Sequence, residues 1–222
     1  MKAKVFALSI LITFYCSNKL SCQTTNAYNE IQRAIVEYEK GNRSIAATLF
    51  ANYKDSGMMS GESNQVYGEM WLNGWGVSKN YYEAVKYFKR SAAQDYAPGM
   101  CYLAYMYISG TGVEKDRAEA ERWYRKASDK GSIYAMESLG DLYLSGQGGT
   151  KDYKEALYWY RKGAALNSGC SLFKIGLIYE NGYGVNQNIN EALKYYRLCS
   201  KKISGYEENA LEKIKRLSVN KH

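Results

Sequence analysis

The sequence has little of what most catalytic and metal-binding sites need. Its single histidine, His222, is the last residue of 222. A serine triad, a cysteine–histidine dyad and a histidine zinc site each need an imidazole held by its neighbours. Two of the five cysteines fall in the first 22 residues, and the other three, Cys101, Cys170 and Cys199, have no C-x-x-C spacing. The composition therefore argues against an enzyme, and we expect no catalytic residues, no cofactor and no metal ion.

Long apolar runs are also missing. The run from Val5 to Tyr15 is too short to span a bilayer as a permanent helix. It follows Lys2 and Lys4 and precedes Leu20-Ser21-Cys22, an order typical of a cleaved export signal. We predict that residues 1–22 are a signal peptide and that the mature chain is periplasmic or secreted, with no integral membrane segment.

Two other interpretations of this leader stay open. Leu20-Ser21-Cys22 loosely resembles a lipobox, and Cys22 would then carry a lipid anchor in a membrane-anchored lipoprotein. An uncleaved leader would itself anchor the chain.

A strong charge of one sign is absent once the leader is removed. The formal charge is +8, but the leader holds three lysines and no acid, which leaves 27 basic against 22 acidic residues. The basic residues recur at one register, as in Arg125-Lys126 and Arg161-Lys162, and do not gather beside stacking aromatics as in nucleic-acid modules. We interpret them as a solvated outer face and expect no nucleic-acid partner.

What the sequence does contain is a Gly-x-Gly motif that occurs four times, at intervals of 36 residues. A period of this size is typical of stacked helical hairpins. Between these motifs an alanine and a pair of aromatic residues also recur every 36 residues. The motifs are Gly74-Trp75-Gly76, Gly110-Thr111-Gly112, Gly146-Gln147-Gly148 and Gly182-Tyr183-Gly184; the alanines are Ala84, Ala120, Ala156 and Ala192; the aromatic pairs are Tyr87-Phe88, Trp123-Tyr124, Trp159-Tyr160 and Tyr195-Tyr196.

This pattern predicts an all-α fold, an α/α right-handed superhelical solenoid of helical hairpins. The glycines end each first helix with positive φ, the alanine lets two helices approach, and the aromatics fill the space between layers. After the leader we expect an N-terminal capping hairpin at 23–61 with its turn near Gly41, four repeats at 62–205, and a C-terminal capping helix and tail at 206–222. The repeats would divide into 62–97, 98–133, 134–169 and 170–205.

The residues also carry a family resemblance. Gly-x-Gly-Val, then Ala-x-x-Trp-Tyr-Arg-Lys-Ala (Ala120 to Ala127), then Ala135-x-x-x-Leu139-Gly140-x-x-Tyr143-x-x-Gly146 resembles the Sel one-like repeat family, a relative of the tetratricopeptide repeats. The resemblance covers residues ~62 to 217. It implies an adaptor or scaffold, often in envelope or secreted proteins. A cysteine-rich branch of the family is exported and binds penicillin-type compounds, but this chain lacks its regular cysteine pattern.

In such arrays the first helices line the concave face, where positions not used for packing can contact a partner. The tetratricopeptide groove offsets, taken by resemblance, give a predicted partner-binding groove with Tyr105, Tyr134 and Phe173 as anchors. A blander interpretation, in which these residues merely cover the inside of the curve, stays open. The groove residues are Gln65, Glu69, Cys101, Tyr105, Ile108, Tyr134, Glu137, Asp141, Leu144, Phe173, Leu177 and Lys213.

A disulfide between Cys170 and Cys199 is a further hypothesis, because export permits one and a hairpin brings its two ends together. Carboxylate pairs such as Glu114 with Asp116 are interpreted as solvated surface. Our first hypothesis is thus an exported scaffold or adaptor that binds a protein or peptide through its concave face. The alternative is an envelope hydrolase or β-lactam-binding protein of the cysteine-rich type.

Overall fold

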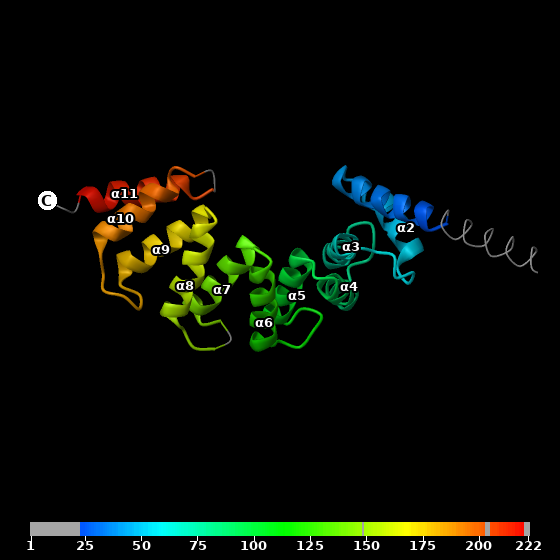
Figure 1. Cartoon of the computed structure of the whole chain (residues 1–222), viewed down its shortest axis with the longest axis horizontal. Coiled ribbons are helices and arrows are strands. Elements are labelled where there is room, and N and C mark those ends of the chain that lie inside the picture. The colour runs from blue at the N-terminus through cyan, green and yellow to red at the C-terminus, as the bar shows by residue number, and fades with distance from the viewer. Residues whose placement is uncertain (1–22, 148, 203–204, 220–222) are drawn as a thin grey trace, which may run out of the picture. The chain divides into compact units, whose positions relative to one another are not determined.

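The computed structural model describes residues 23–147, 149–202 and 205–219, which divide after Asp95 into two compact units. Every regular element in these ranges is an α-helix, as predicted (Figure 1). The predicted signal peptide with Cys22, and the single histidine, lie outside the described residues. Within the described ranges, no helix is long and apolar enough to cross a membrane.

The helices form consecutive hairpins. The first unit contains a helix at 23–39, α2 (Arg43–Tyr53), α3 (Gly61–Asn73) and α4 (Tyr81–Ala93). The second contains α5 (Ala97–Ser109), α6 (Arg117–Asp129), α7 (Ile133–Ser145), α8 (Tyr153–Ala165), α9 (Gly169–Asn181), α10 (Ile189–Cys199) and α11 (Glu207–Val219). From α5 to α10 each helix begins 36 residues after its counterpart one hairpin earlier.

The helix ends follow from the repeated residues. At the start of α9 the Ser168 side chain accepts a hydrogen bond from the backbone N–H of Ser171, which satisfies a donor that the first turn leaves open. At its end Gly182 has φ 70° and donates its N–H to the carbonyl of Ile178. This left-handed conformation costs free energy for residues other than glycine. The first glycine of the Gly-x-Gly motif ends α3, α5 and α7 in the same way. The predicted role of these glycines is confirmed.

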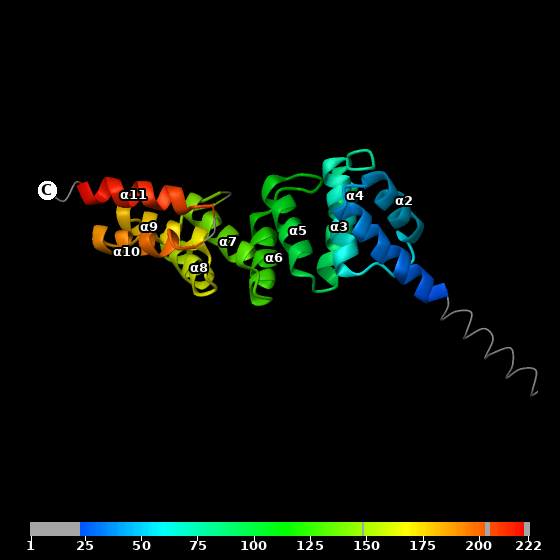
Figure 2. The ribbon, with the colours of Figure 1, turned by 90° about the horizontal axis from the view of Figure 1, so that it is seen from above.

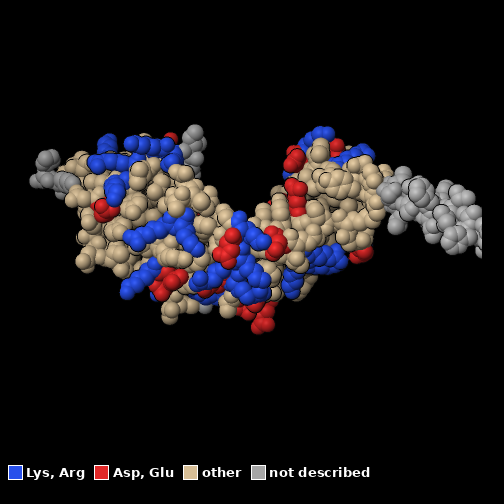
Figure 3. Space-filling model, viewed as in Figure 1, with Lys and Arg blue, Asp and Glu red and all other residues tan. Residues whose placement is uncertain are grey.

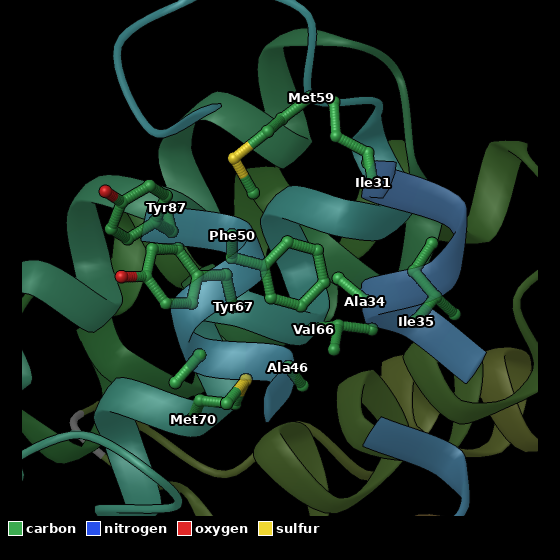
Figure 4. Packing of buried hydrophobic residues seen from close by; sticks show 11 residues of the cluster. Ile31, Ala34, Ile35, Ala46, Phe50, Met59, Val66, Tyr67, Met70 and Tyr87 are labelled. Carbon is green, nitrogen blue, oxygen red and sulfur yellow. The ribbon is translucent and has the colours of Figure 1, made fainter. Parts of the chain in front are cut away.

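The core of the first unit is built from aromatic rings around small residues (Figure 4). The ring of Tyr67 on α3 lies 5.3 Å from that of Phe50 on α2 and 4.7 Å from that of Tyr87 on α4, measured between centroids. Ala34 and Ala46 are fully buried where the first hairpin closes. The short turn predicted at Gly41 is present, with φ 85°.

In the second unit the hairpins pack on one another in chain order. α6 packs against α7, α8 against α9, and α10 against α11. Figures 1 and 2 show α5, α7, α9 and α11 on the inner side of the bend in this unit, with α6, α8 and α10 outside. The first helix of each hairpin therefore supplies the inner surface on which the predicted groove falls.

Candidate partner-binding site

The inner side of residues 96–219 contains a cavity of about 780 Å³, which we call the central hollow. It opens between α5, α7 and α9 and the loops after α7 and α9. Four predicted groove residues line it: Tyr105, Ile108, Asp141 and Leu144. The others along its wall are Ser109, Tyr124, Ser138, Leu142, Ser145, Gln147, Lys151, Tyr153, Lys174 and Tyr183.

A second cavity of about 390 Å³, the tyrosine pocket, lies on the other side of Tyr105. Its lining residues are Pro98, Cys101, Tyr102, Tyr105, Ser132 and Tyr134. Tyr105 and Tyr134 keep 47% and 57% of their surface exposed. Two of the three predicted anchors are thus accessible side chains that flank a cavity.

Tyrosines of the outer helices reach toward the inner side because the inner helices carry small residues beneath them. Tyr160 of α8 is fully buried, and a Cβ on Gly140 of α7 would lie only 2.7 Å from its ring carbon Cδ1. Gly176 of α9 leaves the same room for Tyr196 of α10. The glycine is needed there for space, and the tyrosine hydroxyl emerges on the far side of the helix layer.

That hydroxyl organises the charged floor of the central hollow. Tyr160 donates to Oδ1 of Asp141 at 2.7 Å, and the Lys174 ammonium lies 2.6 Å from the same oxygen. Burial, and then the charge of Asp141, raise the pKa of Tyr160 well above its usual range. Asp141 is therefore a charge-paired acceptor, and so is not a free carboxylate that a partner could use.

The other two acids of α7 and α9 are also engaged. Glu137 accepts a hydrogen bond from the hydroxyl of Ser168. Glu180, at the end of α9, is buried and accepts from Tyr196, Lys213 and Arg216. Burial tends to raise the pKa of Glu180, but these hydrogen bonds and the two cations together hold it below its usual value. The predicted groove residue Lys213 thus ties α11 to α9.

Several predicted groove residues lie elsewhere. Phe173 is only 9% exposed, with the ring centroid of Tyr206 5.3 Å from its own, so this predicted anchor offers little surface to a partner. Leu177 packs against the same core. Gln65 and Glu69 belong to the first unit, where Gln65 donates to Glu69 at 2.7 Å and the hydroxyl of Tyr38 donates to Glu69 at 2.6 Å.

The proposed disulfide is not formed in this structure. Cys170 and Cys199 are both thiols. Cys199 is buried, with its Sγ 3.8 Å from the carbonyl oxygen of Tyr206. The segment that leads into α11 accounts for this arrangement, because the Tyr206 side chain is also the hydrogen-bond neighbour of Cys170.

Basic and aromatic residues outside the predicted groove positions also line the central hollow. Lys151 occupies the place that Lys79, Lys115 and Gln187 hold in the other repeats, just before a second helix. Tyr153 is the first residue of α8 and Tyr183 lies in the loop after α9, and their ring centroids are stacked 5.1 Å apart. These residues could have been predicted from the 36-residue spacing, because it holds in the loops as well as in the helices.

Metal chemistry finds no support in the part of the chain that is described. No group of three or more His, Cys, Asp or Glu residues within it is placed to hold a metal ion. What its inner surface offers is an aromatic pocket beside a polar hollow.

The fold and this surface define the class as a helical-hairpin repeat protein. A family model for the Sel1 repeat matches residues 63–96, 97–132, 133–168 and 171–200, and the chain belongs to that family. No curated protein matches the sequence closely enough to count as a relative.

Solved structures agree with this assignment. A Sel1 repeat protein from Oxalobacter formigenes is 30% identical, with a TM-score of 0.70 over 86% of this chain and 85% of that one. The protective antigen c5321 of uropathogenic Escherichia coli, which displays an SLR fold, is 29% identical with a TM-score of 0.71. The match to c5321 covers 82% of this chain but only 40% of that protein. A putative Sel1 repeat protein from Klebsiella pneumoniae, 18% identical over 88% of this chain and 96% of its own, shares the fold with a TM-score of 0.55.

Proposed function

We propose that this Sel1 repeat protein is an exported scaffold that binds another protein through the inner face of residues 96–219. The observation that carries the proposal is the pair of exposed tyrosines, Tyr105 and Tyr134, on either side of the tyrosine pocket. Large exposed aromatics at a cavity are the usual anchors of protein interfaces, because they bury much area for little lost rotamer entropy.

The charged groups support binding over catalysis. Asp141, Glu137 and Glu180 all accept hydrogen bonds within the fold, so these carboxylates are already engaged by other side chains. A general acid or base would need a group able to exchange protons with a substrate in the cavity.

The test is a comparative affinity capture from the native envelope fraction. The wild-type protein is compared with the double variant Tyr105→Ala/Tyr134→Ala, and with Tyr158→Ala as a control. Tyr158 is 48% exposed on α8 and lines neither cavity. We expect wild type and the control to retain the same proteins and the double variant to lose them. Equal capture by all three would refute the inner face as the binding site.

Export is tested separately, at the N-terminus. Mass spectrometry of the mature protein should find a chain that begins at or near Gln23 and carries no acyl groups. An acylated Cys22 would make the protein a membrane-anchored lipoprotein, and an intact leader would contradict cleavage.

A further inference from the structure

The charges of residues 96–219 are divided unequally between the two layers of helices. The inner helices α5, α7, α9 and α11 hold four basic and six acidic residues, a net charge of −2. The outer helices α6, α8 and α10, with the loops and turns that join the layers, hold 14 basic and eight acidic residues, a net charge of +6. Figure 3 shows basic side chains over much of this unit, with fewer acidic ones between them. The positive excess of the unit therefore belongs to its outer layer.

The solvent-facing side of the outer helices repeats every 36 residues. On each helix three residues, spaced by four, form a row that runs into the turn after the helix. We call the three rows the basic face: Arg122, Lys126 and Lys130; Tyr158, Lys162 and Leu166; Lys194, Leu198 and Lys202. Side chains join neighbouring rows, since Arg125 lies 3.7 Å from Glu155 and Lys202 donates to Oδ1 of Asn167 at 2.9 Å. None of the nine residues is acidic.

Three members of the basic face are apolar or aromatic and still exposed. Tyr158, Leu166 and Leu198 keep 48%, 45% and 42% of their surface accessible. The packing of the repeat does not require them, because the other repeats have only basic or amide residues at the same positions. Those residues are Lys86, Arg122 and Lys194 for Tyr158; Gln94, Lys130 and Lys202 for Leu166; and Arg90, Lys126 and Lys162 for Leu198.

The acids beside the basic face do not cancel its charge. Glu119 lies 2.7 Å from Arg122, and Glu191 lies 3.2 Å from Lys194, so each is paired with one cation of its own helix. Arg197 and Lys201, which flank Leu198 in sequence, are both exposed, and no ion pair to either is found among the described residues. An exposed leucine thus lies between cations that have no acidic partner in the fold.

We propose that the basic face binds the surface of an anionic lipid bilayer, with Tyr158, Leu166 and Leu198 in the headgroup region and the surrounding cations against the lipid phosphates. Leucine and aromatic side chains among lysines and arginines are typical of segments that lie in the membrane interface. Basic residues near an anionic bilayer add to the binding. The inner face stays free for a protein partner, so this proposal does not depend on the proposed function.

Two other partners fit this surface less well. A nucleic acid would be held by the cations through its phosphates, but it would gain little from two exposed leucines. A peptide needs a pocket for its anchoring side chain, and neither the central hollow nor the tyrosine pocket involves any residue of the basic face. A bilayer is broad, anionic and able to take up leucine side chains.

The test is cosedimentation of purified residues 23–222 with large unilamellar vesicles. The leader is left out because its apolar run and lysines would themselves bind lipid, and residues 23–222 keep the helices of both compact units. We expect binding to vesicles with about one-third phosphatidylglycerol in phosphatidylcholine, and none to phosphatidylcholine alone. Binding should weaken as salt rises.

Two double variants test the two kinds of contact. Arg197→Gln/Lys201→Gln should lower the partition coefficient on the order of twentyfold, because each basic residue near an anionic bilayer contributes about fivefold. Leu166→Gln/Leu198→Gln should lower it about tenfold, because it removes apolar surface that enters the interface. Glutamine already stands at the position of Leu166 in the first repeat, as Gln94.

Lys115→Gln/Lys215→Gln is the matched control. It removes the same charge from the loop before α6 and from α11, where both lysines are exposed and neither belongs to the basic face. Its partition coefficient should stay within about twofold of wild type, because charges farther than a Debye length from the lipid are screened. Thermal unfolding of all three double variants should match wild type, since every altered side chain is at least 42% exposed or lies in an exposed position.

No binding to phosphatidylglycerol vesicles, equal loss in the control pair, or unchanged binding of the leucine pair would each overturn the proposal. A short DNA duplex gives the remaining comparison. Tighter binding to the duplex than to the vesicles would mean that the cations serve a nucleic acid, and the bilayer would be the wrong partner. Affinity capture through Tyr105 and Tyr134 would be unaffected by either result, so the inner-face function is judged separately.

Discussion

The tight fit of the Tyr160 ring over Gly140 leads to a quantitative prediction. A methyl group added at Gly140 would lie 2.7 Å from two ring carbons, where carbon atoms normally keep 3.5–4.0 Å, so the ring would have to retreat by about 1 Å. It has little freedom to do so, because Tyr160 is fully buried and its hydroxyl is held by Asp141 at 2.7 Å.

Two opposing effects decide the outcome of Gly140→Ala. Overpacking a well-filled core costs ~1–3 kcal/mol, and we expect the upper half of that range because both ends of the ring are held. Replacing a mid-helix glycine by alanine returns about 1 kcal/mol through helix propensity. The steric cost wins, for a net loss of roughly 1–2 kcal/mol and a fall in melting temperature of roughly 3–6 °C for a chain of this size.

Circular dichroism melts of four proteins test this: wild type, Gly140→Ala, Tyr160→Leu and the double variant. Without the ring, Gly140→Ala should stabilise the protein, so the two changes should couple by ~2 kcal/mol or more. Ala104, which holds the same register one repeat earlier, gives the propensity control, since Ala104→Gly should only destabilise. A Gly140→Ala protein as stable as wild type, with no coupling to Tyr160, would refute the reasoning.

Three further predictions concern single contacts. Glu180→Gln should lower stability at neutral pH and make stability depend less on acid. The pKa of Glu180 in the folded protein lies below its usual 4.5, so the carboxylate stabilises the fold above pH 4.5 and this contribution is lost as pH falls through the folded pKa. Thermal melts of both proteins at several pH values would show the difference. Arg125→Met should lower the free energy of unfolding in urea by ~0.5–1 kcal/mol, because the guanidinium lies 5.0 Å over the ring of Trp159 and 3.0 Å from the hydroxyl of Tyr143. Arg197 holds the same register two repeats later, and the described residues show no such contact for it, so Arg197→Met should have no measurable effect. Ser91→Ala should cost ~1 kcal/mol in the same assay, because its buried hydroxyl donates to the carbonyl of Gly61 at 2.6 Å.

The helix ends could be predicted from sequence because their causes are local. A glycine such as Gly146 ends a helix through its own φ, and a residue such as Asp152 begins the next through hydrogen bonds within three residues. Because the same residues recur every 36 positions, the same start positions, and for all but α10 the same end positions, recur in each hairpin from α3 to α10.

The site was less predictable because its residues are set by neighbours that the repeat does not contain. Phe173 stands at a groove register, but Tyr206, which precedes α11, covers it. Lys151 reaches the central hollow from a loop, and Tyr153 reaches it from the first residue of α8; the prediction counted positions along the first helices alone and so left both out. Tyr105 and Tyr134, in contrast, stay exposed beside the tyrosine pocket, and their role as anchors remains a prediction.

The docking of α11 shows what happens where the repeated pattern changes. Between the inner hairpins, Arg161 of one repeat reaches the hydroxyl of Tyr179 in the next at 3.0 Å, which joins the layers through an aromatic residue. Thirty-six residues later the same places hold Arg197 and Lys215, two cations that cannot make this contact. α11 instead packs Ala210, Ile214 and Leu217 against the core and adds the ion pairs of Glu180. Because ion pairs weaken with salt and acid more than aromatic packing does, α11 should be the helix of this unit whose amides exchange first as salt rises or pH falls. Exchange that begins in α7 or α8 under those conditions would show that apolar contacts, and not Glu180, hold α11 in place.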